Sequence, residues 1–166
     1  MDGQGAIAIQ AGKDYAKITD DTVFHVLTLL RFGRFDEVLD VAARPKQEAS
    51  GGLWDFAQGY AHLKNGDVDF TRVYLDRVME LAVATTARFR FDDAKLLLQT
   101  VGGVLEGEIH RDAGNLSAAI RAFERAVEVE DQLESSEPEP RPCSARHWLG
   151  AALLEVKRYA EAERVY

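Results

Sequence analysis

Four segments of this 166-residue chain repeat one outline, in which a turn separates two helix-like apolar patterns. The segments cover residues 23–39, 54–75, 104–126 and 145–166, and their turns align at Gly33, Gly66, Gly114 and Lys157. Glycine reaches the positive φ that ends a helix without steric cost. We therefore expect Lys157 to adopt the same turn with a small strain. A recurring outline of this kind predicts a repeat of helix pairs.

The apolar residues within each segment follow the helical period rather than the alternation of strands. In the third segment Leu116, Ala119, Ile120 and Phe123 share one stripe, and charged residues occupy the other side. No segment predicts a sheet. The turns are 33, 48 and 43 residues apart, which we attribute to lengthened helices and to a proline-rich loop at 135–142. Pro142 suits the first position of the following helix.

Helix starts are marked by short polar residues that can accept backbone N–H groups. Asp20 or Asp21 suits the first helix pair, and Asp67 and Asn115 directly follow two of the glycine turns. Residues 6–17 predict a further helix, the remnant of a preceding unit, and the first five residues are expected to be frayed.

The spacing of small and aromatic residues resembles the tetratricopeptide repeat (TPR) family. In the fourth segment the matching positions are Gly150–Leu154, Tyr159, Ala162 and Tyr166. In the third segment they are Gly107, Gly114, Ala119, Phe123 and Ala126. In the second segment they are Trp54, Gly59, Tyr60, Gly66 and Leu75. The second segment departs from the pattern at Thr71 and Val78, and the first keeps only Gly33 and Phe35. Stretches 31–39, 106–109 and 145–154 are also similar to the C-terminal repeats of large bacterial TPR proteins of uncharacterised function.

This resemblance covers about residues 20–166 and implies an all-α, right-handed helix-pair solenoid of about four units. We expect residues 1–19 to form a tail with a helix remnant. The units would span about 20–49, 50–90, 91–140 and 141–166, with the last incomplete, so we interpret the chain as part of a longer array. The family implies a protein-binding scaffold without shared catalysis. Its partner would be a protein or peptide, and self-association through the incomplete C-terminal unit is a further expectation.

In helix-pair solenoids the first helix of each unit lines the concave face. Carried over from the family, the groove positions are Val23, Leu27, Arg31, Phe56, Tyr60, Lys64, Val104, Glu108, Asp112, His147, Ala151 and Glu155. Phe56 and Tyr60 are the expected anchors, with Lys64 facing a carboxylate and Glu108 and Glu155 facing a cation. The alternative, that Phe56 and Tyr60 belong to the core, stays open because groove and core positions are adjacent on a helix.

Catalytic and metal-binding constellations are incomplete. Cys143 and His147 stand four apart, which suits a thiol–imidazole pair, but no third group can be assigned. Glu106 and His110 also share a face, whereas Glu108 projects away from them, and two ligands are too few for a metal. We predict no enzyme activity, no metal and no cofactor. The runner-up function is a non-catalytic regulatory or lid domain of a larger enzyme.

The composition limits the kinds of partner that we expect the chain to bind. Twenty Lys and Arg residues against 28 Asp and Glu give a net charge of −8, which argues against nucleic acid and anionic membranes. The acidic run 128–139 predicts a solvated helix end. The longest apolar stretch, at 148–154, is far shorter than the roughly 20 residues of a membrane span. Residues 1–5 lack the basic start of a secretory signal, which favours, without fixing, a cytoplasmic location.

Overall fold

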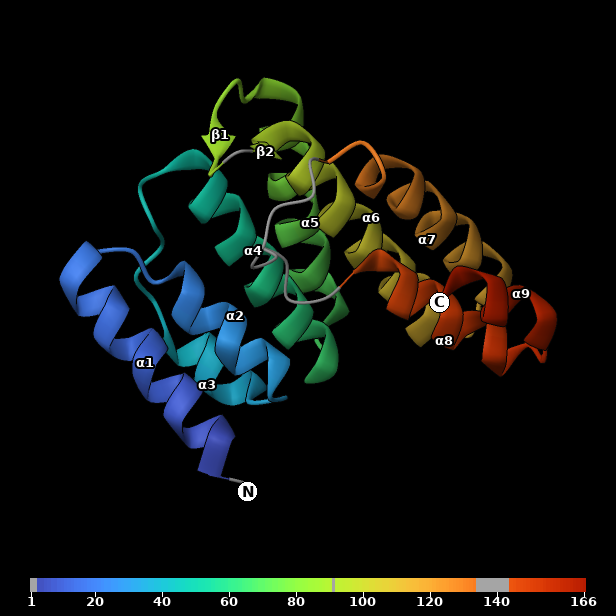
Figure 1. Cartoon of the computed structure of the whole chain (residues 1–166), viewed down its shortest axis with the longest axis horizontal. Coiled ribbons are helices and arrows are strands. Elements are labelled where there is room, and N and C mark those ends of the chain that lie inside the picture. The colour runs from blue at the N-terminus through green and yellow to red at the C-terminus, as the bar shows by residue number, and fades with distance from the viewer. Residues whose placement is uncertain (1–2, 91, 134–143) are drawn as a thin grey trace.

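The computed structural model describes residues 3–90, 92–133 and 144–166, and these are mostly helical. They form nine helices and one small sheet: α1 (Gly3–Thr19), α2 (Val23–Arg31), α3 (Phe35–Asp40), α4 (Glu48–Lys64), α5 (Val68–Ala84), β1 (Arg88–Phe89), β2 (Asp92–Asp93), α6 (Ala94–Asp112), α7 (Leu116–Glu130), α8 (Ala145–Glu155) and α9 (Tyr159–Val165). The all-α prediction is confirmed at the level of fold class. The helices follow one another across the molecule from α1 to α9 (Figure 1).

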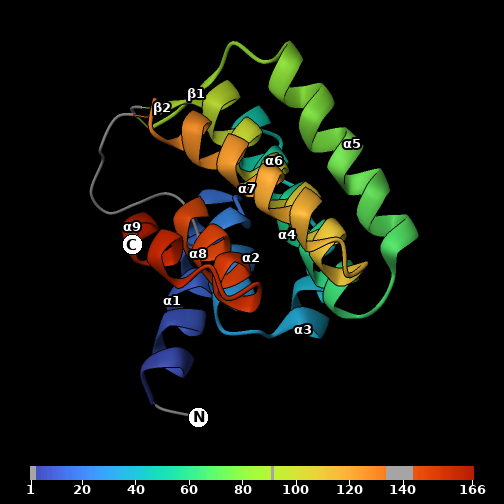
Figure 2. The ribbon, with the colours of Figure 1, turned by 90° about the vertical axis from the view of Figure 1, so that its right-hand side faces the viewer.

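Helices pack with their neighbours in the chain, and the even-numbered helices α2 to α8 also pack with one another in order. Helix α1 lies against α2, and α4 with α5, α6 with α7 and α8 with α9 form packed pairs. Helices α2, α4, α6 and α8 also touch one another in series. Figure 2 shows α5 on the outside of the molecule, on the far side of α4 and α6 from α2. The even-numbered helices α2 to α8 therefore form a continuous row.

The four aligned turns have the same backbone geometry. Gly33, Gly66, Gly114 and Lys157 all adopt a positive φ, between 62° and 82°. At each turn this residue donates its N–H to the carbonyl three residues back, and the next residue donates to the carbonyl five residues back, at 2.8–3.0 Å. These paired bonds satisfy carbonyls that the helix end would otherwise leave free. The prediction that Lys157 adopts the glycine turn is confirmed.

Two predicted caps are present, at α5 and α7, whereas the N-cap position of α2 is Thr22, whose side chain makes no capping bond. The side chain of Asp67 accepts the N–H of Phe70 at 3.3 Å, and that of Asn115 accepts the N–H of Ala118 at 3.2 Å. Of the two candidates before α2, Asp21 accepts the N–H of Val23 at 2.9 Å. Each bond satisfies an N–H that has no partner within the helix, so polar residues at these positions stabilise the helix starts.

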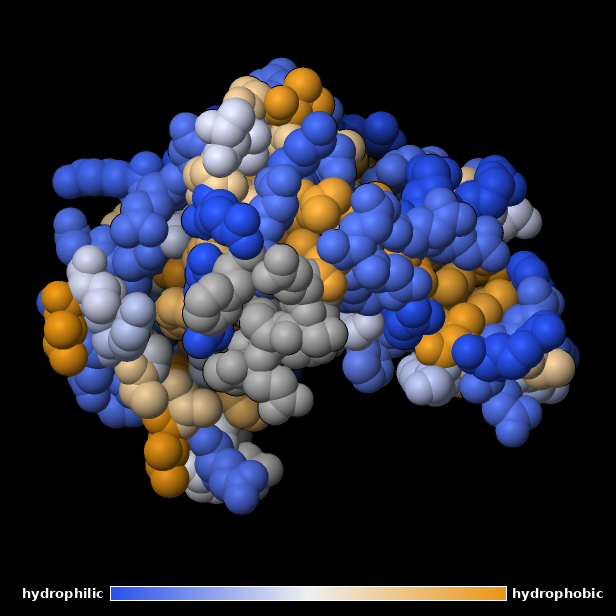
Figure 3. All heavy atoms as spheres, turned by 45° about the horizontal axis from the view of Figure 1, so that its top comes forward, coloured by the Kyte–Doolittle hydropathy of each residue, from blue (hydrophilic) through white to orange (hydrophobic). Residues whose placement is uncertain are grey.

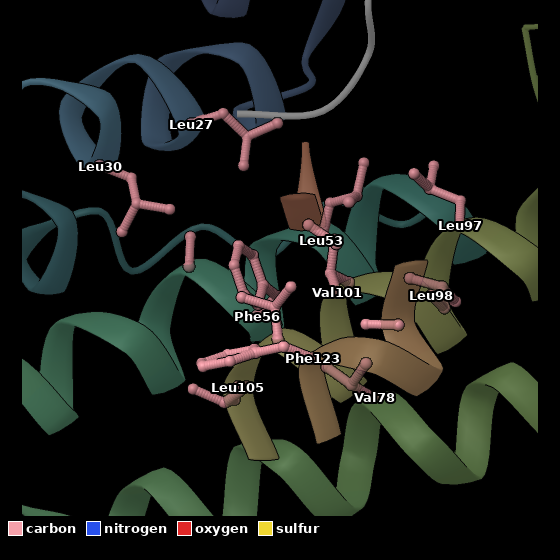
Figure 4. Packing of buried hydrophobic residues seen from close by; sticks show 14 of the residues in the cluster. Leu27, Leu30, Leu53, Phe56, Val78, Leu97, Leu98, Val101, Leu105 and Phe123 are labelled. Atoms are coloured by element: carbon pink, nitrogen blue, oxygen red, sulfur yellow. The ribbon is translucent and has the colours of Figure 1, made fainter. Parts of the chain in front are cut away.

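The hydrophobic core runs along the row of helices. Leu53 and Phe56 of α4 pack among Leu98 and Leu105 of α6 and Phe123 of α7 (Figure 4). Glycines allow this close approach. A Cβ on Gly107 would lie 2.2 Å from the Phe123 ring, and one on Gly150 would lie 2.4 Å from the Tyr166 ring. On the face drawn in Figure 3, the coloured residues are mainly hydrophilic with smaller apolar patches.

The connector between α3 and α4 is held by side chains of α4. Gln58 donates to the carbonyl of Val38 at 2.7 Å, and the indole of Trp54 donates to that of Val41 at 3.1 Å. The guanidinium of Arg44 binds both oxygens of buried Asp55, at 2.7–3.1 Å. These contacts pair polar atoms that burial would otherwise leave unsatisfied.

Two sequence expectations are wrong. Strands β1 and β2 pair as a short antiparallel hairpin, with Arg88 opposite Asp93 and Phe89 opposite Asp92, although no strand was expected. Glu130, placed in a solvated helix end, is buried and accepts hydrogen bonds from Ser144 Oγ at 2.6 Å and Ala145 N at 3.0 Å. It thereby caps the start of α8 from the end of α7. The proline-rich loop and Pro142 lie outside the described residues.

Candidate functional site

A network of charged and aromatic side chains joins α4, α6 and α8. We call it the α4–α6–α8 cluster, and its members are Tyr60, Lys64, Glu108, Arg111, Trp148 and Glu155. At its centre the buried carboxylate of Glu108 accepts hydrogen bonds from Lys64 Nζ at 2.6 Å, Tyr60 Oη at 3.2 Å and Arg111 at 3.0 Å. Arg111 also donates to Glu155 through Nε at 2.9 Å.

Helical spacing brings these side chains together. Tyr60 and Lys64 stand four apart on α4, and Glu108 and Arg111 stand three apart on α6, so each pair shares one face. Tyr60 and Glu108 both lie six residues before the positive-φ glycine of their turn. Since α4 packs on α6, and α6 on α8, the two faces meet along the row.

The charges of the cluster hold Glu108 ionised. Burial by itself raises the pKa of this carboxyl, but the hydrogen bond and charge of Lys64, and those of Arg111, outweigh it and leave the pKa below its ordinary 4.5. A lowered folded-state pKa stabilises the fold above pH 4.5, and this contribution is lost as the pH falls through the lowered value. Burial opposes the charge of Lys64 as well, yet its bond to Glu108 leaves the Lys64 pKa raised.

Aromatic rings surround the centre of the cluster. The ring of Tyr60 lies 6.0 Å from that of Phe56, 6.1 Å from Phe35 and 6.3 Å from Trp148, between ring centroids. The ammonium of Lys64 lies 4.9 Å from the centre of the Tyr60 ring, within the range of a cation–π contact. Burial, together with the charge of Glu108, raises the pKa of Tyr60, so its hydroxyl stays a donor at neutral pH.

The structure divides the twelve predicted groove residues into three sets. Tyr60, Lys64, Glu108 and Glu155 come together in the cluster, although Glu108 is buried and already bound by cations. Another set is exposed or half-buried outside it: Arg31, Asp112, His147 and Ala151. The remaining set lies in the core, where it offers no surface to a partner: Val23, Leu27, Phe56 and Val104. Figure 4 shows Leu27 and Phe56 in these positions.

A small error in helical register explains why four residues predicted for the groove lie in the core. Adjacent residues on a helix differ by about 100° in direction, so a small error in register exchanges core and surface positions. For Phe56 the structure places the side chain as the open alternative expected, among Leu53, Leu105 and Phe123. Tyr60 combines both interpretations, because its half-buried ring contacts Phe56 and its hydroxyl reaches the polar cluster.

Two members of the cluster were missed by sequence reasoning. Arg111 stands three residues after Glu108 on one helix, and this opposite-charge spacing is the signal that could have found it. Trp148 carries no comparable signal, because its partner is Tyr60, 88 residues earlier in the chain, whose hydroxyl lies 3.5 Å from the indole nitrogen.

The candidates for other chemistry are placed as follows. Cys143 lies outside the described residues, and His147 is exposed with its ring against Tyr166. Glu106 binds Arg125 at 2.9 Å and lies 4.0 Å from His110. Within the described ranges no group of three His, Cys, Asp or Glu side chains is arranged to hold a metal. None of the helices described is long and apolar enough to span a membrane.

No protein-family model, curated protein or solved structure matches the chain. A functional proposal therefore depends on the repeated turns and on the geometry of the α4–α6–α8 cluster.

Proposed function

We propose that the chain is a TPR-like solenoid that binds a peptide or protein surface along its α2, α4, α6 and α8 face. The shared hydrogen bonds of the four turns support a repeat of helix pairs. So does a repeated contact between the two helices of a pair. Gly107 meets Phe123 and Gly150 meets Tyr166, and each aromatic residue stands sixteen positions after its glycine.

The observation that carries the binding role is the partial exposure of the cluster. Side chains of Lys64, Arg111 and Glu155 keep 29–40% of their surface open, while Glu108 beneath them is buried. The buried carboxylate fixes the positions of the two cations, so little side-chain freedom remains to be lost when a partner binds. Charged groups of both signs beside the Tyr60 and Trp148 rings suit an extended or helical peptide with polar and apolar side chains.

A displayed library of random peptides, selected on the full chain, would test the proposal. Affinities of the selected peptides would then be measured for Arg111→Gln and for the matched control Arg72→Gln, on the exposed side of α5. We expect Arg111→Gln to weaken binding by about tenfold or more, as for a hot-spot arginine, and the control to leave it unchanged.

Melting temperatures of both variants separate lost binding from lost folding. A large melting loss in Arg111→Gln with unchanged peptide affinity would assign the cluster to structure alone. Equal weakening by the two variants would place the binding surface elsewhere.

A further inference from the structure

A pocket of about 800 Å³ opens at the other end of the helix row, between α1, α2, the start of α4 and β1. We call it the hairpin pocket. It shares no residue with the α4–α6–α8 cluster, and residues of α1, α2, the start of α4 and the hairpin line it. In Figure 1, α1 and α2 lie on one side of α4, and β1 lies over its start. The volume falls within the range of small-molecule sites.

Three aromatic rings from three elements form the apolar wall. Tyr15 of α1 meets Phe24 of α2 edge-on at 5.2 Å, and Phe24 lies 6.2 Å from Phe89 of β1, between ring centroids. Ala8, Ala11 and Gly12 of α1 also line the pocket, and their small size leaves room for a ligand. Rings prefer edge-on or offset contacts with other aromatic systems, so this wall suits a planar aromatic molecule.

The charges of the pocket favour an anion. The charged residues that line the pocket are two arginines, Arg88 and Arg90, and one carboxylate, Asp21, in a chain whose net charge is −8. Asp21 is already bound on both oxygens, by the N–H of Val23 at 2.9 Å and by Ser50 Oγ at 2.7 Å. A guanidinium has five N–H donors and can accept an anion while it keeps other contacts.

The backbone at Arg90 adds a second observation. Its φ is 59°, a left-handed conformation that side chains other than glycine, asparagine and aspartate rarely adopt. Glycine would occupy this position without strain, yet the chain has an arginine at the edge of the pocket. Strain of this kind is concentrated at functional sites.

We propose that the hairpin pocket binds a planar aromatic molecule that carries a carboxylate. The rings of Tyr15, Phe24 and Phe89 contact its apolar part, and Arg88 or Arg90 binds the carboxylate. This site is independent of the peptide-binding face, so either proposal can fail without the other.

Titration calorimetry on the full chain with three probes of one shape tests the proposal. The probes are 2-naphthoate, the neutral 2-naphthamide and the cationic 2-naphthylmethylammonium. We expect the anion to bind about tenfold more tightly than the amide, as for one charge-assisted hydrogen bond, and the cation to bind most weakly. Arg88→Gln combined with Arg90→Gln should remove the advantage of the anion and leave the affinity of the amide unchanged.

A second pair of variants locates the probe. Ala11→Leu fills the pocket from α1 and should abolish binding of all three probes, whereas Ala6→Leu, on an exposed site of the same helix outside the pocket, should not. Leucine is a strong helix former, and circular dichroism of both variants checks the fold. Equal affinity for anion and amide, tightest binding of the cation, or equal loss in the two leucine variants would each overturn the proposal.

Discussion

At the scale of single residues, buried polar groups show two different outcomes. Glu108 is surrounded by three donors and stays charged. His25 of α2 is also buried, but its Nδ1 has no hydrogen-bond partner among the described residues. Burial and the positive charge of Lys13 lower the pKa of His25, and Glu37 offsets only part of this. The fold therefore favours the neutral ring.

As the pH falls, the titration of His25 should destabilise the protein before the carboxylates are protonated. A histidine with a lowered folded-state pKa leaves stability intact above its ordinary pKa of 6.5. As the pH falls below 6.5, the unfolded chain binds a proton that the folded chain resists, so the free energy of unfolding declines until the folded-state pKa is passed. Urea denaturation between pH 7.5 and pH 5 would measure this decline.

His25→Gln removes the titrating group from α2 and should flatten that part of the profile. A variant that keeps the full decline would show that other groups cause it. The loss at Glu108 is separable, because it occurs below pH 4.5.

At the scale of elements, the four turns were predictable and the tertiary caps were not. A positive φ is predicted by the residue type at Gly33, Gly66 and Gly114. The caps that follow two of these turns are likewise predicted by Asp67 and Asn115. These are local properties that a sequence carries directly. Glu130, in contrast, caps a helix that starts fifteen residues later, and that contact depends on how α7 and α8 pack.

The hairpin was not predicted, and the groove was predicted only in part. Strands of two residues, as at Arg88–Phe89, are too short to show alternation. Four of the twelve residues predicted for the groove lie in the core, because a helix that packs on both sides has little free surface. The sequence therefore predicts where the helices lie in the chain. The direction of each side chain depends on how neighbouring helices pack, which the sequence does not show directly.

Replacing Lys157 with glycine should stabilise the fourth helix pair. Lysine at a φ of 62° costs about 1 kcal/mol relative to glycine, and its exposed side chain makes no contact described here that would be lost. We expect Lys157→Gly to raise the free energy of unfolding by about that amount. Lys46→Gly, at an exposed position without a positive φ, is the control and should give no gain.

The reverse substitution at an equivalent turn completes the test. A Cβ on Gly114 meets nothing within 4 Å, so Gly114→Ala reports the backbone alone and should lose about 1 kcal/mol. A stabilised Gly114→Ala, or an unchanged Lys157→Gly, would contradict the equivalence of the turns.

At the scale of the whole molecule, apolar surface is exposed around α8 and α9. Tyr159 and Tyr166 are 62% and 66% exposed, and Leu154 is also open, whereas Ala162, expected to be uncovered, is buried. Exposed apolar groups that lie close together favour association of copies.

We expect the average mass measured by light scattering to rise with concentration, and Tyr159→Arg to suppress the rise by placing a charge in this surface. Val83→Arg, on an exposed apolar position of α5, is the matched control. A monomer at every concentration, or equal suppression by the control, would argue against the α8–α9 surface.

The ion pairs of the α4–α6–α8 cluster connect successive helices of the row. Lys64–Glu108 joins α4 to α6, and Arg111–Glu155 joins α6 to α8. Salt should weaken the more exposed α6–α8 ion pair first, because the Debye length falls to about 3 Å at 1 M. The α4–α6 ion pair has a buried carboxylate and should separate only when acid protonates Glu108. We expect the radius of gyration measured by small-angle scattering to increase in two stages, first with salt and then with acid. A radius that stays constant through both would show that packing alone sets the spacing of these helices.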